Sequence, residues 1–166
     1  MGILHNSSTK VLSLNSKSFL SFSHLCKNFQ VGRILAIDYG SKKSGLASTD
    51  SLKIAAHGLK TIATVELIDF LISYTSVEDV EEIVIGLPRH ADGNLSGNAN
   101  EILKFGDQLK KLFPKLKISF FDESYSSVEA RKRILESGAK KKKRRDKSLV
   151  DKIAAVIILQ SYLGHI

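Results

Sequence analysis

The chain has 166 residues, of which 43% are hydrophobic, and it carries a formal net charge of +8 at pH 7. This length and composition, with no apolar run long enough to span a bilayer, predict one soluble globular domain and exclude a helical membrane protein. The single cysteine, Cys26, excludes an intrachain disulfide.

The positive charge is concentrated in two segments. Residues 1–37 carry four basic residues and no acid, and the stretch KKKKRRDK, residues 140–147, carries seven bases and one acid. These segments leave a net charge of −2 for the rest of the chain. So dense a patch favours a polyanionic partner such as nucleic acid, although a solvated loop that keeps the protein soluble explains it equally well.

The first 32 residues differ in composition from the rest of the chain. They contain seven serines, no acid and no apolar periodicity. This is somewhat like an organelle transit peptide, but such peptides favour arginine, and the first arginine here is Arg33. We expect residues 1–32 to be a disordered extension and residues 33–166 to form the domain. We expect a cytoplasmic protein, with an organelle as the alternative if the extension is a transit peptide.

From residue 33 onward the pattern alternates between strands and helices. Three strands are predicted first, then a helix, a strand, a helix, a strand and two helices, over residues 33–39, 44–50, 54–62, 65–74, 81–88, 98–113, 117–123, 126–137 and 147–163. The three opening strands indicate a meander, and the later alternation indicates parallel strands with crossover helices. The predicted fold class is therefore α/β, with five strands in a mixed sheet.

The apolar spacing of two helices predicts which side chains they bury. In the helix over 65–74 the expected buried face consists of Val65, Ile68, Leu71 and Ile72. In the helix over 98–113 it consists of Ile102, Phe105, Leu109 and Leu112.

Acidic residues occupy three unusual places. Asp38 ends the first strand, Asp122 and Glu123 end the fifth, and Asp151 lies in the first turns of the last helix, on the face expected to pack on the sheet. Each has an ordinary explanation: a turn residue, exposed strand-end charges, or an acid favoured by the helix dipole. If the first and fifth strands run side by side in parallel, however, these acids meet at one edge of the sheet.

Carboxylates held so close together repel one another unless a cation lies between them. Mg²⁺ prefers oxygen ligands and commonly takes one or two carboxylates together with water and phosphate. Metal ions of this kind activate water and stabilise the leaving oxygen when a phosphodiester is cleaved. Clustered acids beside a basic surface therefore predict metal-dependent cleavage of nucleic acid, with Mg²⁺ or Mn²⁺ as the cofactor.

The chain resembles the YqgF/RuvX family of small RNase H-like proteins from about residue 33 to residue 163. The segments that carry the resemblance are DYGSKKSGLASTD, IVIGLP, the DG of HADGN, FFDES and KKKKRRDKSLVDKIAAVIILQSYL. Members of this family are described as nucleases that process the 5′ end of pre-16S rRNA and as Holliday junction resolvases. The resemblance implies an RNase H-like core in the order βββαβαβα with an acidic metal site.

The resemblance also assigns roles to the acids. Asp38 matches the family's first-strand aspartate, and Asp151 matches its acid on the last helix. The middle acid lies in the family's Asp-Glu-Arg stretch, where this chain has Asp122, Glu123 and Ser124. Glu123 is favoured because its side chain is longer, with Asp122 as a possible second ligand. Ser124 departs from the usual arginine, which puts the catalytic role in doubt unless Lys42, Lys43, Arg89 or Arg131 replaces that arginine.

Basic residues near these acids are candidates for nucleic-acid binding. They are Lys42, Lys43, Arg89, Lys140, Lys141, Lys142, Lys143, Arg144 and Arg145. The long polar loop over 89–100 follows a strand end, so we expect it to border the same cleft.

Several functions remain open from the sequence. The Asp-x-Gly hairpin is also similar to that of actin-like ATPases and sugar kinases, but those proteins need a second such domain, for which this chain is too short. A non-catalytic RNA-binding module stays possible because of Ser124. Between nuclease substrates, pre-rRNA ranks first and branched DNA second, because two symmetric cuts require a dimer and no dimer face is evident. The expected protein is a monomer or a weak homodimer that binds nucleic acid and no membrane.

Overall fold

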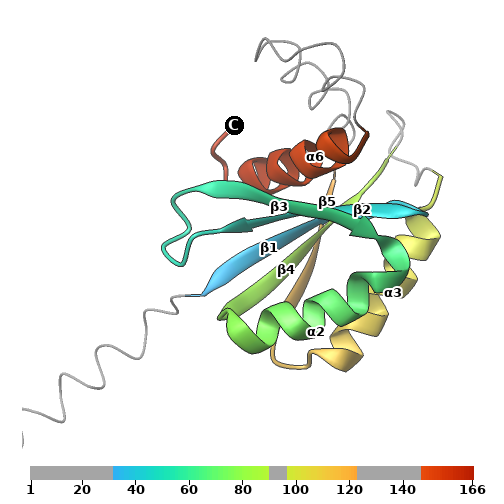
Figure 1. Ribbon diagram of the computed structural model, residues 1–166, viewed down its shortest axis with the longest axis horizontal. Helices are drawn as coiled ribbons and strands as arrows, with labels where there is room; N and C mark the ends of the chain where they lie inside the picture. The colour runs from blue at the N-terminus through green and yellow to red at the C-terminus, as the bar shows by residue number, and fades with distance from the viewer. Residues whose placement is uncertain (1–31, 90–96, 123–146) are drawn as a thin grey trace, which may run out of the picture. The chain divides into compact units, whose positions relative to one another are not determined.

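The computed structural model describes residues 32–89, 97–122 and 147–166 of the chain (Figure 1). The chain divides into two units, Met1–Gln30 and Val31–Ile166, and the described residues all belong to the second. The expectations for the N-terminal extension, for a helix over 126–137 and for the basic residues 140–145 lie outside the described residues. Among the helices that are described, none has the length and hydropathy needed to cross a membrane.

The described elements follow the predicted order of strands and helices (Figure 1). They are β1 Arg33–Asp38, β2 Lys43–Thr49, β3 Ala56–Ala63, the 3₁₀ helix η2 Thr64–Glu66, α2 Leu67–Val77, β4 Val80–Leu87, α3 Ala99–Leu112, β5 Lys117–Asp122 and α6 Lys147–Tyr162. The five strands form one sheet in the order β3-β2-β1-β4-β5. Neighbours among β1, β2 and β3 are antiparallel, whereas β4 is parallel to both β1 and β5. This confirms the predicted mixed five-stranded sheet, with three antiparallel opening strands and two later parallel strands.

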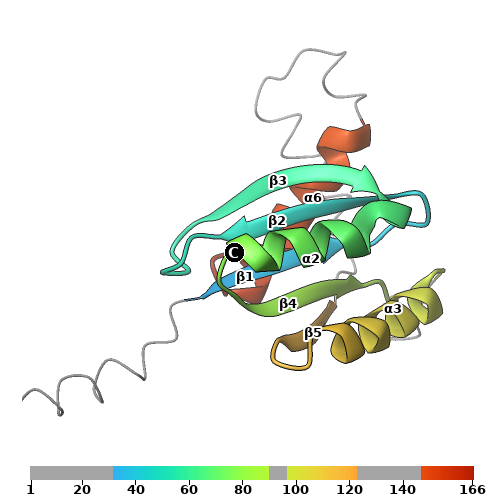
Figure 2. The ribbon, with the colours of Figure 1, turned by 60° about the horizontal axis from the view of Figure 1, so that its bottom comes forward.

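Helices cover both faces of the sheet. Helices α2 and α3 lie on one face and α6 lies on the other (Figures 1 and 2). The core on the α2 and α3 side includes the buried side chains Leu35, Ile37, Leu46, Ile83, Ile85, Leu71, Ile102 and Leu109. The core on the α6 side includes Ile34, Ala36, Ala47, Val84, Ala155, Ile158 and Leu159. Successive strand residues therefore alternate between the two cores, as the pleat of a sheet requires.

The buried face predicted for α2 is confirmed for Leu71 and for Ile68, which packs against the core, and is wrong for Val65 and Ile72. Leu67 and Leu71 are fully buried, whereas Val65 is 90% exposed and Ile72 is 49% exposed. Val65 belongs to the 3₁₀ turn that precedes α2. Val65 therefore precedes α2, and the α-helical spacing that relates Ile68 to Leu71 does not extend to it. In α3 the predicted face is confirmed for Ile102, Phe105 and Leu109, while Leu112 at the helix end is 45% exposed.

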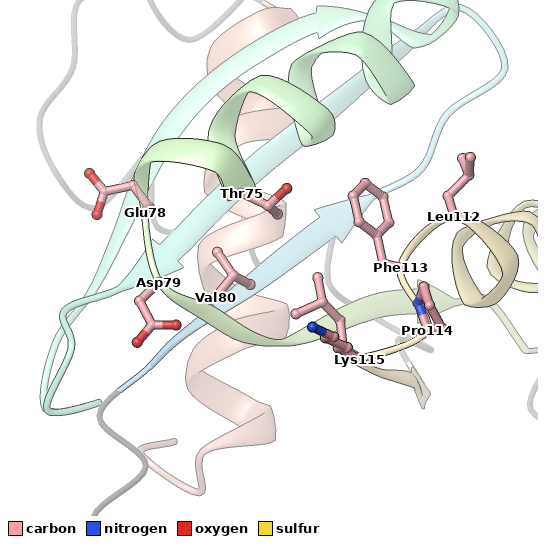
Figure 3. A pocket seen from close by; sticks show the side chains of 9 residues that line it. Thr75, Glu78, Asp79, Val80, Leu112, Phe113, Pro114 and Lys115 are labelled. Carbon is pink, nitrogen blue, oxygen red and sulfur yellow. The ribbon is translucent and has the colours of Figure 1, made fainter.

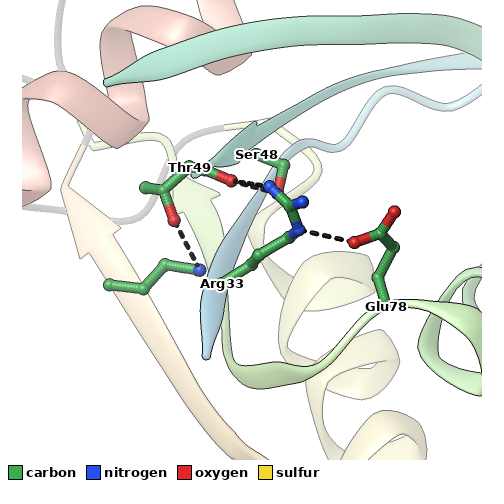
Figure 4. A network of polar contacts seen from close by, with 5 residues as sticks. Arg33, Ser48, Thr49 and Glu78 are labelled. Atoms are coloured by element: carbon green, nitrogen blue, oxygen red, sulfur yellow. Dashed lines mark hydrogen bonds and ion pairs between the residues drawn. The ribbon is translucent and has the colours of Figure 1, made fainter. Parts of the chain in front are cut away.

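A polar cluster anchors the start of the sheet (Figure 4). The guanidinium of Arg33 pairs with Glu78 at 2.6 Å and donates a hydrogen bond to the main-chain oxygen of Thr49 at 2.9 Å. The Thr49 hydroxyl accepts a hydrogen bond from the main-chain N–H of Ile34 at 2.9 Å. Three segments distant in sequence are thereby joined where β1 begins, at the end opposite Asp38.

Candidate active site

Asp38 is the last residue of β1, the central strand of the sheet. Ile34 and Ala36 pack in the core on the α6 side, whereas Leu35 and Ile37 pack in the other core. The same alternation places Asp38 on the α6 side. Asp38 lies opposite Gly45 of β2 in the antiparallel pair.

Glycine in the neighbouring strands lets α6 approach this point closely. A Cβ atom at Gly45 would overlap the main-chain oxygen of Asp151, and one at Gly58 of β3 would come within 2.7 Å of the Lys152 side chain. The start of α6 is also held by a hydrogen bond of 2.7 Å from the Thr61 hydroxyl to the main-chain oxygen of Ser148. The main chain of Asp151 therefore lies against Gly45 of β2, the residue that is paired with Asp38.

The two acids line one cavity of about 660 Å³. Its wall consists of Asp38, Gly40, Ser41, Lys42, Lys43, Asn98 and Asp151. These residues come from the end of β1, the turn that follows it, the start of β2, the residue before α3, and α6. The structure thus brings together the predicted residues Asp38, Asp151, Lys42 and Lys43 from opposite ends of the domain sequence.

The cavity disfavours negative charge on Asp38. Burial, and secondarily the nearby Asp151 carboxylate, raises the pKa of Asp38 to about 7. Among the described residues, no hydrogen-bond donor contacts the Asp38 carboxylate. A divalent cation would supply the missing compensation, and two carboxylates beside an open cavity suit Mg²⁺, which keeps room for water and phosphate oxygens. The donor set therefore fits the predicted metal.

A complete metal cluster is not formed by the described residues alone. No group of three His, Cys, Asp or Glu side chains converges anywhere in residues 32–89, 97–122 and 147–166. Glu123, the favoured middle acid, lies outside those ranges, as do the basic residues 140–145. The described site therefore consists of two acids and the two lysines of the β1–β2 turn region.

Asp122 is not brought together with the other two acids. Asp122 would meet Asp38 if β1 and β5 were neighbours, but β4 lies between the two strands. Asp122 also follows Phe120 at the strand period of two, and Phe120 packs on the core of the α2 and α3 side, away from α6. Its carboxylate lies 3.7 Å from the Arg89 guanidinium. Arg89 is thus placed beside Asp122 rather than in the cavity wall.

Asn98 is a site residue that the sequence did not single out. It lies in the last part of the polar loop over 89–100, which we expected to border the cleft, and its presence in the cavity wall confirms that expectation for this residue. Its side-chain amide donates a hydrogen bond of 3.2 Å to the main-chain oxygen of Tyr39. Asn98 is the first residue of the helix predicted over 98–113, where an asparagine is normally read as a helix cap, so no sequence signal pointed to this contact.

A second cavity lies between the carboxyl-terminal ends of α2 and α3, where β4 begins (Figure 3). Its volume is about 350 Å³, and it is lined by Thr75, Glu78, Asp79, Val80, Leu112, Phe113, Pro114, Lys115 and Leu116. None of the predicted site residues contributes to it. The cavity at the end of β1 is therefore the better candidate for catalysis.

Comparisons with known proteins cover nearly all of the second unit. A family model described as "RuvX: Holliday junction resolvase" matches residues 32–165. A protein of Porphyromonas gingivalis named "Putative pre-16S rRNA nuclease" is 52% identical over 135 residues, which are 81% of this chain and 98% of that protein. A protein of the same name from Bacteroides fragilis is 47% identical over 133 residues, or 80% of this chain and 96% of the relative. The sequence relation thus extends over almost the full length of these relatives.

Solved structures of resolvases are also similar to the chain. The fowlpox virus Holliday junction resolvase has a TM-score of 0.48 at 15% identity and covers 80% of this chain and 98% of its own. T. thermophilus RuvC in complex with a Holliday junction substrate has a TM-score of 0.46 at 13% identity, covering 80% and 96% of the two chains.

Proposed function

Because the chain belongs to the RuvX family, we propose that it is a metal-dependent endonuclease that cleaves structured RNA and processes the 5′ end of pre-16S rRNA. The observation that carries this proposal is the convergence of Asp38 and Asp151 in one cavity beside Lys42 and Lys43. Acids for a cation and lysines for phosphate are the two groups that phosphodiester cleavage requires. The shared name of the curated relatives supports rRNA as the substrate.

Three acids would hold the metal: Asp38, Asp151 and Glu123. Asp122, the second candidate from the sequence, pairs with Arg89 and lies on the face of the sheet that α2 and α3 cover, opposite to α6. We therefore retain Glu123 as the middle acid. When bound, Mg²⁺ or Mn²⁺ supplies activation of water and stabilisation of the leaving oxygen. The protein's own part is to hold the acids on rigid elements at the end of β1 and on α6.

The lysines orient the substrate in this proposal. Lys42 and Lys43 lie in the cavity wall with the acids, so they are placed to bind a backbone phosphate at the site of cleavage. Arg89 and the basic residues 140–145 would extend the contact along the nucleic acid. We further propose that residues 1–32 are an extension outside the catalytic domain, and that the protein is cytoplasmic and acts as a monomer or weak homodimer.

Four-way DNA is the second candidate substrate. The family model's own description favours it. Cleavage of a four-way junction in two symmetric cuts needs a dimer, whereas trimming of pre-rRNA does not. A preference for junction DNA, together with a dimer in solution, would therefore replace the rRNA proposal.

The test compares the wild type with Asp38→Asn, Asp151→Asn and Glu123→Gln on extended pre-16S rRNA and on a four-way DNA junction, each with Mg²⁺ or Mn²⁺. We expect each variant to lose more than about 100-fold in cleavage rate, because even outer partners of metal ligands cost 10–100-fold. The matched control is Asp69→Asn, an exposed acid on α2. If the wild type cuts neither substrate but binds RNA as tightly as Asp38→Asn, the protein is a binding module instead.

A further inference from the structure

The turn between β1 and β2 is held by residues from outside it. Thr64 donates two hydrogen bonds to it, one from its hydroxyl to the main-chain oxygen of Gly40 at 2.6 Å and one from its main-chain N–H to that of Lys42 at 3.0 Å. Asn98 donates its amide to the main-chain oxygen of Tyr39 at 3.2 Å. Three carbonyl groups of the segment 39–42 are therefore fixed by two residues that follow later in the sequence.

Asn98 and Thr64 both contact residues that are distant in the sequence. Asn98 occupies the N-cap of α3 but makes no side-chain capping bond there, and its amide instead reaches a residue 59 positions earlier. The Thr64 hydroxyl also lies 3.0 Å from the hydroxyl of Ser44, whose side chain is fully buried. The turn is thus connected on one side to the start of α3 and on the other to η2, which directly follows β3.

We propose that Asn98 and Thr64 are positioning residues that hold the segment 39–42, and through it Asp38 and Lys42, in the arrangement that metal binding and cleavage need. This inference rests on the proposed function. Among the described residues, no hydrogen bond orients the Asp38 carboxylate itself, so its direction depends on the main chain on which it stands. The carbonyl of the next residue, Tyr39, is the group that Asn98 holds. Asn98 also lines the cavity, so its loss acts directly beside the site.

The test uses Asn98→Ala and Thr64→Val, with Asn100→Ala and Thr64→Ser as matched controls. Asn100 is exposed in the first turn of α3, so its replacement makes the same change in residue type without touching the turn. Thr64→Ser keeps the hydroxyl that Thr64→Val removes. We expect Asn98→Ala and Thr64→Val to weaken Mn²⁺ binding, measured by calorimetry, by about 10–100-fold. We expect kcat for pre-rRNA cleavage to fall by a similar factor with little change in KM, and both controls to resemble the wild type.

A purely structural role would lower the melting temperature while leaving Mn²⁺ affinity and kcat unchanged, and that result would overturn the inference. If the wild type binds Mn²⁺ but cleaves nothing, the proposed function fails, whereas the Mn²⁺ affinities of the variants still decide the positioning role. If the wild type does not bind Mn²⁺, amide hydrogen exchange at residues 40–43 decides whether Asn98 holds the turn. Exchange about 10-fold faster in Asn98→Ala than in Asn100→Ala supports the role, and equal exchange rules it out.

Discussion

At the scale of single residues, Asp38 shows how the site depends on the burial of one carboxylate. A carboxyl that is raised to a pKa of about 7 favours its protonated form in the folded state. Its contribution to stability is therefore complete below the usual pKa of about 4 and is lost as the pH rises from about 4 to about 7. Above that range the folded protein contains a carboxylate in a site that disfavours it until a cation binds.

We therefore expect Asp38→Asn to stabilise the metal-free protein at pH 8 and to leave its stability nearly unchanged at pH 4. The pKa of Asp38 rises from 3.8 to about 7, and one pKa unit corresponds to about 1.36 kcal/mol. The free energy of unfolding should therefore increase by at most about 4 kcal/mol. Urea unfolding at both pH values measures it. With saturating Mg²⁺ at pH 8 the gain should shrink, because the ion stabilises only the wild-type site. A gain that is equal at pH 4 and pH 8, or that Asp107→Asn reproduces, would contradict this account.

At the scale of elements, α6 is attached to the sheet at both ends. Near its start the backbone of Asp151 lies against Gly45, and near its end the hydroxyl of Tyr162 donates a hydrogen bond of 2.6 Å to Glu82 of β4. The buried Glu82 carboxylate also contacts Ser119 at 2.6 Å and Lys117 at 2.9 Å. Burial alone would raise the pKa of Glu82, but these three donors outweigh it and hold the pKa below its usual value.

Gly45→Ala tests the close approach at the start of α6. The new methyl group would overlap main-chain atoms of Asp151 and Lys152, which cannot move without the helix. We expect a loss of about 1–3 kcal/mol of stability, as in overpacked cores, and weaker Mn²⁺ binding because Asp151 is displaced. Gly58→Ala is the control, since its methyl group would meet the flexible side chain of Lys152 instead. Equal behaviour of the two variants in chemical unfolding would argue against a special role of Gly45.

Tyr162→Phe tests the attachment at the other end of α6. Removing one donor from a buried carboxylate should cost about 1–3 kcal/mol near neutral pH. A lowered pKa stabilises the fold above the usual pKa of the group, so this cost should fall as the pH decreases through the range in which Glu82 becomes protonated. Thermal unfolding at pH 7 and pH 3 measures the difference. Tyr74→Phe, which removes a hydroxyl on α2 outside the Glu82 contacts, should be nearly neutral at both pH values.

The elements also show what the sequence could and could not predict. Aliphatic runs predicted all five strands, and the apolar spacing placed Ile102, Phe105 and Leu109 of α3 in the core. Strand order was not predictable, because a period of two specifies faces and not neighbours. For that reason it stayed open whether β1 and β5 are neighbours; β4 lies between them, and the separation of Asp122 from Asp38 was not foreseen. The contact of Asn98 joins residues 59 positions apart, which no local pattern encodes.

At the scale of the whole domain, the larger apolar core and the proposed catalytic residues lie in different parts of the sheet. The side of α2 and α3 buries the larger apolar core, while the acids and lysines gather where β1 ends and α6 begins. The basic run 140–147 ends at the first residue of α6, four positions before Asp151. This covalent link keeps the densest positive charge of the chain within a few residues of the proposed cleavage site, where it would attract a nucleic-acid backbone.

Replacing Lys140 to Lys143 with glutamine should therefore weaken binding of structured RNA and reduce its salt dependence. Each lost phosphate contact lowers the slope of log K against log salt concentration by about 0.7–0.9, so four contacts would lower it by about 3. The control carries the same change of charge on exposed lysines of α3 and the segment after it, Lys104, Lys110, Lys111 and Lys115. Affinity measured between about 50 and 200 mM salt distinguishes the two sets, because a general charge effect would lower both slopes equally. A slope that falls only in the first variant would show that the basic run preceding α6 in the sequence contacts the substrate.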